Sequence, residues 1–126
     1  MLKLSQVELN RISKKIIGCV YEVGKILKYG YLEKVYENAL AHELHKSGLM
    51  VAQQHPVTVK YDGVVVGHYT ADLFVESSVL VELKVVASLD ASHRAQGLNY
   101  LAATGLPLCL LINFGRPRIE IARLVR

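Results

Sequence analysis

Three charged residues, two of them in a strongly apolar stretch, are the first candidates for chemistry in this sequence. Residues 79–86 read VLVELKVV, and Glu82 and Lys84 are the two charges in that run. In a β-strand they would point to the same face, because alternate side chains do so. Taking a charge out of water costs several kcal/mol that pairing often fails to recover, so charges kept in a buried strand usually serve a site. Asp72, ten residues before Glu82, is the natural third member.

The turn before this run decides whether Asp72 and Glu82 meet. With a loop of two residues, Asp72 faces Leu83 and misses Glu82. With a loop of three, residues 76–78, Asp72 pairs with Glu82, and their β-carbons lie about 5 Å apart. Two carboxylates that close repel each other unless a cation lies between them. A metal site therefore predicts the three-residue loop or an equivalent bulge.

These residue types suit phosphodiester hydrolysis. Carboxylate oxygens favour Mg²⁺ or Mn²⁺. Lys84, on the same face, is expected to position or deprotonate a nucleophilic water and to offset charge on a phosphate. The residues also leave open a structural ion pair between Glu82 and Lys84, or a strand with one exposed face. A purely structural role requires Asp72 and Glu82 to lie on opposite sides of the sheet.

Two helices are predicted before the strands that carry these charges. Ser5 and Glu8 match a capping box for the first helix, which ends at residues 28–30. A second helix is expected from about Tyr31, with Gly48 as its C-terminal cap. Apolar residues recur at three- and four-residue steps in both segments, as on one face of a helix.

The later part of the chain predicts a sheet interrupted by a third helix. That helix is capped by Ser88 or Asp90 and ends at Gly105. Asp62-Gly63 between two apolar runs indicates a hairpin. Strands are expected at residues 57–61, 64–66, 70–76, 79–86, 107–114 and 118–125. The order of two helices, four strands, a helix and two strands indicates one α/β domain over residues 1–126, with a mixed sheet flanked by helices.

The charged residues also resemble a known motif. Asp72 followed by Glu82-Leu83-Lys84 resembles the D…ExK signature of the PD-(D/E)XK nuclease superfamily. The expected element order is similar to the restriction-endonuclease-like core of that superfamily. Gln96 and Tyr100 resemble the QxxxY motif of RecB-like nucleases.

A second resemblance is more specific and covers the chain from about residue 12 to its end. Residues 30–36, GYLEKVY, read G-x-x-E-x-x-Y. With ENAL directly after them and LLINFG at 110–115, the chain is similar to a small bacterial or archaeal GxxExxY protein.

The resemblance implies a role for each matching residue. Asp72 and Glu82 would be metal ligands, with the Leu83 backbone carbonyl as a third and Glu33 as a further ligand, direct or through water. Lys84 would serve the water or the scissile phosphate. Gln96 would orient the catalytic groups or contact the phosphate. Supporting or substrate-binding roles are considered for four more residues: Tyr100, His93, Arg94 and Tyr36.

Three of these four have plainer alternatives. His93 should share a helix face with Gln96 and could touch DNA or the attacking water, but a surface or supporting histidine is the favoured interpretation. Arg94 is expected to be solvated, with phosphate contact as the alternative. Tyr36 is expected to pack in the core beneath Glu33 rather than to act as a catalytic phenol.

The composition is that of a globular protein with a polyanionic partner. Of 126 residues, 52% are hydrophobic and 21% charged. The net charge of +4 favours nucleic acid as the partner. No apolar run is long enough to cross a membrane, and the polar start MLKLSQ is unlike a signal peptide, so a cytoplasmic protein is expected. Cys19 and Cys109, each among apolar neighbours, are expected in the core.

The leading hypothesis is a Mg²⁺- or Mn²⁺-dependent nuclease, with DNA as the expected substrate. One alternative is a nucleic-acid-binding or regulatory module on the same fold, without catalysis. Another is a metal-dependent hydrolase of nucleotides or other small phosphate esters. A homodimer or a partner protein is expected to supply specificity, because 126 residues leave little room for a recognition domain.

Overall fold

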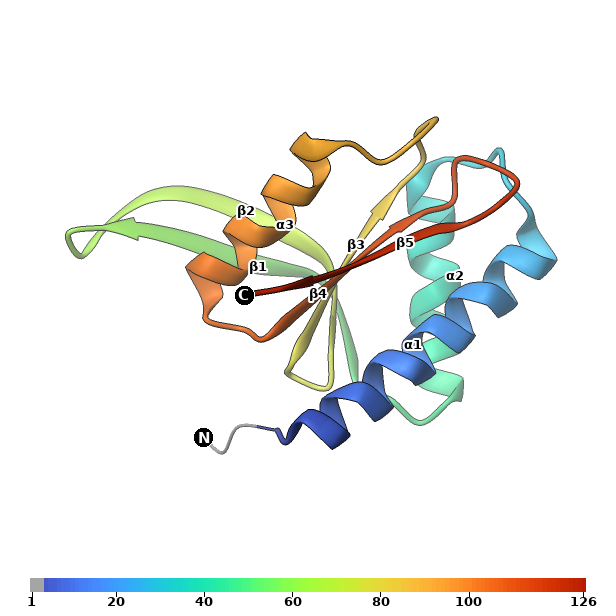
Figure 1. Ribbon diagram of the computed structural model, residues 1–126, viewed down its shortest axis with the longest axis horizontal. Coiled ribbons are helices and arrows are strands. Elements are labelled where there is room, and N and C mark those ends of the chain that lie inside the picture. Colours follow the sequence, from blue (N-terminus) through green and yellow to red (C-terminus); the bar gives the residue numbers. More distant parts are fainter. Residues whose placement is uncertain (1–3) are drawn as a thin grey trace.

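Within residues 4–126, one mixed sheet of five strands forms the centre, and three helices cover it (Figure 1). The computed structural model describes residues 4–126, so the first three residues lie outside the description. The elements are α1 (Gln6–Leu27), α2 (Glu33–Lys46), β1 (Val51–Tyr61), β2 (Val64–Val75), β3 (Val79–Lys84), α3 (Ala91–Thr104), β4 (Leu108–Asn113) and β5 (Glu120–Val125). The strands follow the order β1-β2-β3-β4-β5, and only β3 and β4 run parallel. The expected α/β fold is confirmed.

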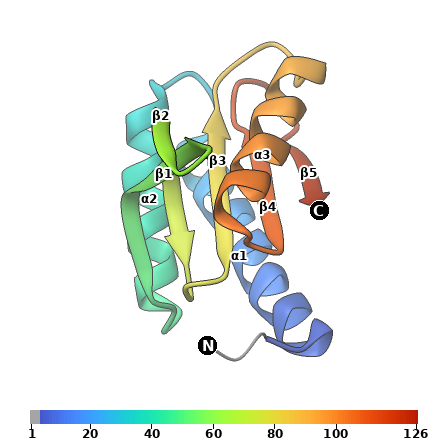
Figure 2. The ribbon, with the colours of Figure 1, turned by 90° about the vertical axis from the view of Figure 1, so that its left-hand side faces the viewer.

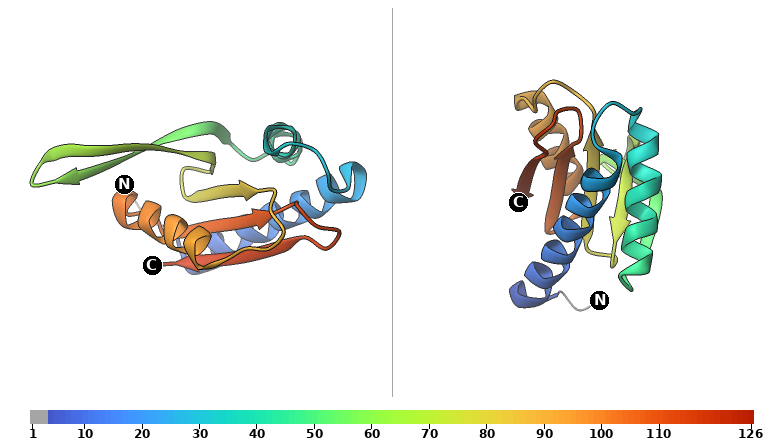
Figure 3. Two further views of the ribbon diagram at one scale, coloured as in Figure 1. Left: turned by 90° about the horizontal axis from the view of Figure 1, so that it is seen from above. Right: turned by 90° about the vertical axis from the view of Figure 1, so that its right-hand side faces the viewer.

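The helices lie on the two faces of the sheet, with α1 and α2 on one face and α3 on the other (Figures 2 and 3). Strand β3 is buried on both faces. Val81 and Leu83 pack with the cluster under α1 and α2, whereas Leu80 packs with Tyr100 of α3. Because side chains alternate along a strand, Glu82 and Lys84 share the face of Leu80. The two charges are therefore directed toward α3.

Local signals fix the helix ends that position the site. Ser5 and Glu8 form the expected capping box at the start of α1. Helix α2 begins at Glu33, slightly later than expected. Asp90 caps α3, and Gly105 ends it with φ of 74°, the left-handed conformation that glycine adopts without strain. Helix α3 therefore has the bounds that its caps predict.

The predicted order of strands is wrong in one respect. Residues 64–66 and 70–76 were expected as two strands, but they form the single strand β2. Gly67 does not break it, because the hairpin partner β1 is equally long and begins at Val51 rather than residue 57. The sheet therefore has three strands before α3. The long β1–β2 hairpin projects beyond the rest of the sheet (Figures 1 and 3).

Two expectations from composition concern the core and the membrane. Cys19 and Cys109 are both buried and neither forms a disulfide, which confirms their assignment to the core. Within residues 4–126, none of the helices has the length and apolar character needed to cross a membrane.

Candidate active site

The turn between β2 and β3 has the three residues that a metal site requires. Val75 pairs with Val79, so residues 76–78 form the loop. The antiparallel ladder between the two strands ends two pairs later, just before it reaches Asp72 and Glu82. The expected register is therefore present, and the strands separate at the position where the two acids face each other.

Beyond the end of the ladder, the two carboxylates replace the missing backbone contacts. The Asp72 backbone N–H donates to Oε1 of Glu82 at 2.8 Å, and the Leu83 backbone N–H donates to Oδ2 of Asp72 at 2.8 Å. Each carboxylate is thus fixed to the opposite strand through one oxygen, an arrangement we call the crossed carboxylate pair. A purely structural role required Asp72 and Glu82 to lie on opposite sides of the sheet. Instead, each side chain binds the backbone beside the other.

The strands separate because the β1–β2 hairpin twists sharply at Asp72. Leu73 packs with the cluster under α1 and α2, whereas Ala71, two residues away on β2, packs with the cluster under α3. Side chains two apart in a regular strand share a face, so the chain turns over between them. On β1 the residue opposite is Gln54, whose φ of 55° is rare for a residue with a side chain. The twist removes Asp72 from the ladder with β3.

Lys84 and Gln96 connect the crossed carboxylate pair to α3. Nζ of Lys84 donates to Oε1 of Gln96 at 3.2 Å, and both side chains are half-buried. Lys84 follows Glu82 by two residues on β3 and so shares its face. The glutamine oxygen accepts a hydrogen bond from the Lys84 ammonium and holds that ammonium near the carboxylates.

Burial and mutual repulsion raise the proton affinity of the acids. Burial, followed by the charge of Asp72, raises the pKa of Glu82 to about 8. Burial also raises the pKa of Asp72, although the hydrogen bond from the Leu83 N–H opposes this. Burial, then the charge of Asp72, raises the pKa of Glu33 at the start of α2. Three acidic groups therefore repel one another at one place, and a cation there would relieve the repulsion.

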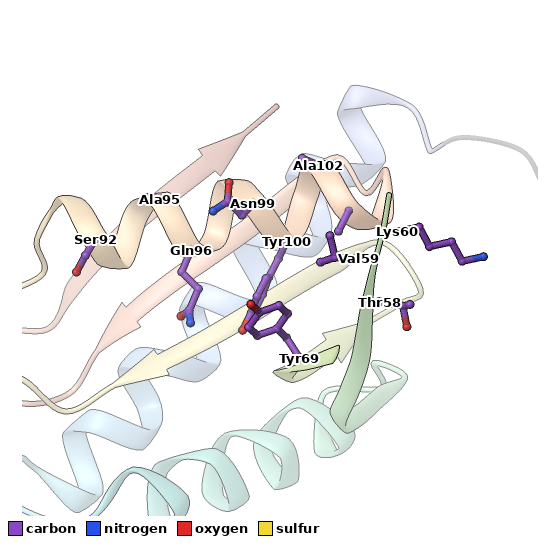
Figure 4. A pocket seen from close by; sticks show the side chains of 11 residues that line it. Thr58, Val59, Lys60, Tyr69, Ser92, Ala95, Gln96, Asn99, Tyr100 and Ala102 are labelled. Atoms are coloured by element: carbon purple, nitrogen blue, oxygen red, sulfur yellow. The ribbon is translucent and has the colours of Figure 1, made fainter. Parts of the chain in front are cut away.

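Tyr100 of α3 lies near the same acids. Its side chain is buried, and burial, followed by the charges of Glu82 and Asp72, raises its pKa to about 12. Its ring packs against that of Tyr69 on β2, with the centroids 5.8 Å apart. Gln96 and Tyr100 extend from α3 toward the sheet (Figure 4). The two residues one helical turn apart thus bring an amide and an aromatic ring to the site.

Comparison with known protein families identifies the family. A sequence profile described as the PD-(D/E)XK nuclease superfamily matches residues 10–124. The chain belongs to the PD-(D/E)XK nuclease superfamily. The match includes all the residues of the crossed carboxylate pair and of α3, and it confirms the superfamily that the motif predicts. Membership of the GxxExxY group and the RecB-like QxxxY motif stay predictions.

Two solved structures are similar to this PD-(D/E)XK domain. The alkaline exonuclease LHK-Exo from Laribacter hongkongensis aligns with 99% of this chain and 72% of its own, with a TM-score of 0.54 and 14% identity. SSO0001 aligns with 95% of this chain and 61% of its own, with a TM-score of 0.58 and 18% identity. The domain thus spans less than two thirds of SSO0001, and such low identities establish the fold alone. No curated protein matches the chain.

PD-(D/E)XK nucleases generally use divalent metals, and the donors present here fit such an ion in part. Within residues 4–126, no three His, Cys, Asp or Glu side chains gather as a complete metal cluster. Asp72 and Glu82 supply two carboxylates. The N–H and C=O of one strand residue point the same way, so the Leu83 carbonyl also points into the gap. Two carboxylates and a carbonyl oxygen suit a hard cation that keeps several waters.

The structure gives local contacts or exposure for the other three candidates. Tyr36 is fully buried and stacks on Phe114, with centroids 4.5 Å apart, which agrees with its expected core packing. Nδ1 of His93 accepts from the Asp90 backbone N–H at 3.1 Å, so this histidine closes the capping box of α3. Arg94 is exposed on α3. Any role of these residues in substrate binding stays a prediction.

A further buried acid, Glu37, lies next to the site and was missed by the motifs. Its Oε1 accepts from Nε2 of Gln54 at 2.8 Å, and its Oε2 accepts from Nε2 of Gln53 at 2.7 Å. Gln54 in turn lies 3.5 Å from Oδ1 of Asp72. The available signal was the four-residue spacing from Glu33, which places both acids on one face of α2. The bond to Gln54 could not be foreseen, because it depends on a left-handed backbone.

Proposed function

We propose that this protein is a nuclease that hydrolyses the phosphodiester bonds of DNA and uses Mg²⁺ or Mn²⁺. The observation that carries the proposal is the crossed carboxylate pair beside Lys84. Its two acids are fixed by hydrogen bonds of 2.8 Å, and burial raises the pKa of both. Membership of the PD-(D/E)XK superfamily supports the reaction class, and the proposal adds the metal, the substrate and the residues.

In this proposal Asp72 and Glu82 hold the cation together with the Leu83 carbonyl, and Glu33 reaches it through a water. Each carboxylate already uses one oxygen to bind the opposite strand, so its orientation is set before the ion arrives. The bound cation would supply an activated water and would neutralise charge on the phosphate.

Lys84 would act on the phosphate and on the water. Its ammonium has three N–H groups, and one of them donates a hydrogen bond to Gln96. The other two can donate hydrogen bonds to a phosphate oxygen, where negative charge grows in the transition state, and to the attacking water. Gln96 is then a positioning residue, because it sets the direction of the Lys84 ammonium.

The arrangement favours hydrolysis over binding without catalysis. Glu82 is buried and its pKa is raised, so it destabilises the folded protein when it ionises. Such an acid has no benefit for a module that only binds DNA. A second copy or a partner protein would add contacts for recognising a particular DNA structure.

The direct test is cleavage of single-stranded, duplex and branched DNA by the purified protein in Mn²⁺. We expect cleavage that EDTA stops. Lys84→Ala should lower the rate at least about 100-fold, since it removes charge stabilisation in the transition state, while Mn²⁺ binding measured by calorimetry stays nearly unchanged. Lys14→Ala, at an exposed position on α1, is the matched control and should cleave normally.

Failure to cleave any substrate, with no metal bound at millimolar concentration, would refute the proposal. DNA binding that persists after Asp72→Asn, with no turnover by the parent protein, would favour the non-catalytic module instead.

A further inference from the structure

A groove lies between the β1–β2 hairpin and α3 (Figure 4). Its volume is about 930 Å³. The hairpin side includes Val59, Lys60 and Tyr69, and the helix side includes Gln96, Asn99 and Tyr100. The groove exists because the hairpin turns over at Asp72 and continues past the edge of the sheet, so that its outer half faces α3.

One end of the groove is linked to the crossed carboxylate pair through Gln96 and Tyr100. Gln96 lines the groove and also accepts the hydrogen bond from Lys84. Tyr100 lines it too, and this residue is close enough to Glu82 and Asp72 for their charges to act on it. A chain lying in the groove would therefore reach the place where Lys84 and the two acids meet.

The lining suits bases rather than a series of phosphates. Tyr69 is 52% exposed although its ring packs against Tyr100, so part of the ring remains open to a ligand. Aromatic rings stack on the bases of single strands, whereas bases in a duplex are already stacked on each other. Among the eleven lining residues, all of them in the described part of the chain, Lys60 is the one charged residue. A groove that tracks duplex DNA needs several cations.

We propose that this groove binds a single nucleic-acid strand adjacent to the scissile phosphate, with a base stacked on Tyr69 and a phosphate near Lys60. The inference rests on the proposed nuclease function and specifies the form of its substrate. Lys60 extends outward at the far end of the groove from Gln96, so the strand would lie along α3 (Figure 4).

The test measures strand binding without cleavage. A fluorescent oligothymidylate of about 12 nucleotides is titrated with protein in EDTA, and its anisotropy gives the Kd. Tyr69→Ala should weaken binding about 5- to 100-fold, as expected for the loss of one stacked base. Tyr69→Phe, which keeps the ring, should bind within about twofold of the parent. Tyr61→Ala is the matched control, since this tyrosine is 75% exposed and lies outside the groove.

A second variant covers the case in which Tyr69→Ala fails to fold. Lys60 is exposed, so Lys60→Glu should fold and should bind the strand several-fold more weakly. If Lys60 and Lys84 are the two phosphate contacts, log K should fall with log salt at a slope of about −1.4. A duplex of equal length should bind more weakly than the strand.

Strand binding that is unchanged in both Tyr69→Ala and Lys60→Glu would overturn the inference, as would tighter binding of the duplex. Hydrolysis of bis(4-nitrophenyl) phosphate in Mn²⁺ separates this outcome from failure of the proposed function, because that small ester does not need the groove. If the parent hydrolyses no phosphodiester but its strand binding depends on Tyr69, the proposed nuclease function is refuted. The proposal that the groove binds a single strand is then still supported.

Discussion

Glu82 is the most strongly perturbed acid of the site. It is 5% exposed, and burial followed by the Asp72 charge raises its pKa to about 8. The groups that act on it come from three elements, namely Asp72 of β2, Lys84 of β3 and Glu33 of α2. Near pH 7 the metal-free protein therefore keeps a proton on Glu82. A divalent cation would have to displace this proton, which couples metal binding to pH.

The stability of the metal-free protein should depend on Glu82. Its pKa rises from 4.5 to about 8 on folding, so its favourable contribution is present below pH 4.5 and is lost as the pH rises through 8. Glu82→Gln cannot ionise. In EDTA at pH 9 it should exceed the parent in free energy of unfolding by several kcal/mol, at most about 5, and the two should be similar at pH 4.

Urea unfolding followed by circular dichroism across this pH range measures the difference. Glu22→Gln, at an exposed position on α1, serves as the control and should follow the parent at every pH. Parallel stability curves for Glu82→Gln and the parent would show that Glu82 ionises freely in the folded protein.

The sequence identifies the candidate site residues that belong to the motifs. It does not identify the neighbouring residues that hold them in place. The sequence shows an acid and a base in the apolar strand 79–86. The three-residue loop is predicted because it is the loop that places Asp72 opposite Glu82, and the structure has this loop. Glu37 carries no such mark, since a glutamate on a helix is usually solvated. Its burial depends on the amides of Gln53 and Gln54, which reach it only in the folded sheet.

At the scale of elements, α2 supports the hairpin at the point where it twists. Glu37 accepts hydrogen bonds from Gln53 and Gln54 of β1 and from Lys34 of its own helix. Gln54 is the residue with positive φ opposite Asp72. The helix therefore stabilises the backbone conformation that removes Asp72 from the ladder and leaves its carboxylate for the site.

Loss of this support should affect both stability and metal binding. Glu37→Ala removes the acceptor on α2 of the Gln54 amide, whereas Gln53 keeps Asn38, so the free energy of unfolding should fall by about 0.5–1.5 kcal/mol. Mn²⁺ affinity should also fall, because Asp72 is less firmly placed. Asn38→Ala is the matched control, since exposed Asn38 also accepts from Gln53 but does not contact Gln54.

Chemical unfolding and calorimetric Mn²⁺ titration of the two variants provide the measurement. If Glu37→Ala loses stability but binds Mn²⁺ like the parent, α2 supports the fold without positioning Asp72.

The sequence patterns predicted where helices and strands lie, but they did not predict where one strand continues without a break. The caps at Ser5, Asp90 and Gly105 mark helix ends correctly, because capping is a local interaction. The predicted division of β2 at residues 67–69 was wrong. In the projecting hairpin these residues pair with β1 through their backbone, although their side chains bury no apolar face. The left-handed Gln54 gives no local signal, since glutamine rarely adopts that conformation.

On the scale of the whole molecule, the site lies where three parts of the fold converge. The start of α2, the twist in the β1–β2 hairpin and the end of β3 meet on one side, and α3 covers the other (Figures 1 and 2). The groove then continues from this point between α3 and the hairpin. The register between β2 and β3 brings Asp72 near Glu82 and Lys84, and the packing of α2 and α3 on the sheet adds Glu33 and Gln96.

The presence of a cation between Asp72 and Glu82 is tested most directly by a crystal structure with Mn²⁺ and anomalous scattering data. We predict one Mn²⁺ peak in the gap between β2 and β3, with oxygens of Asp72 and Glu82 about 2.1 Å away. The Leu83 carbonyl should complete the protein ligands, and the peak should be absent in Asp72→Asn. An empty gap at saturating Mn²⁺, or a peak bound by other residues alone, would contradict the proposed metal site.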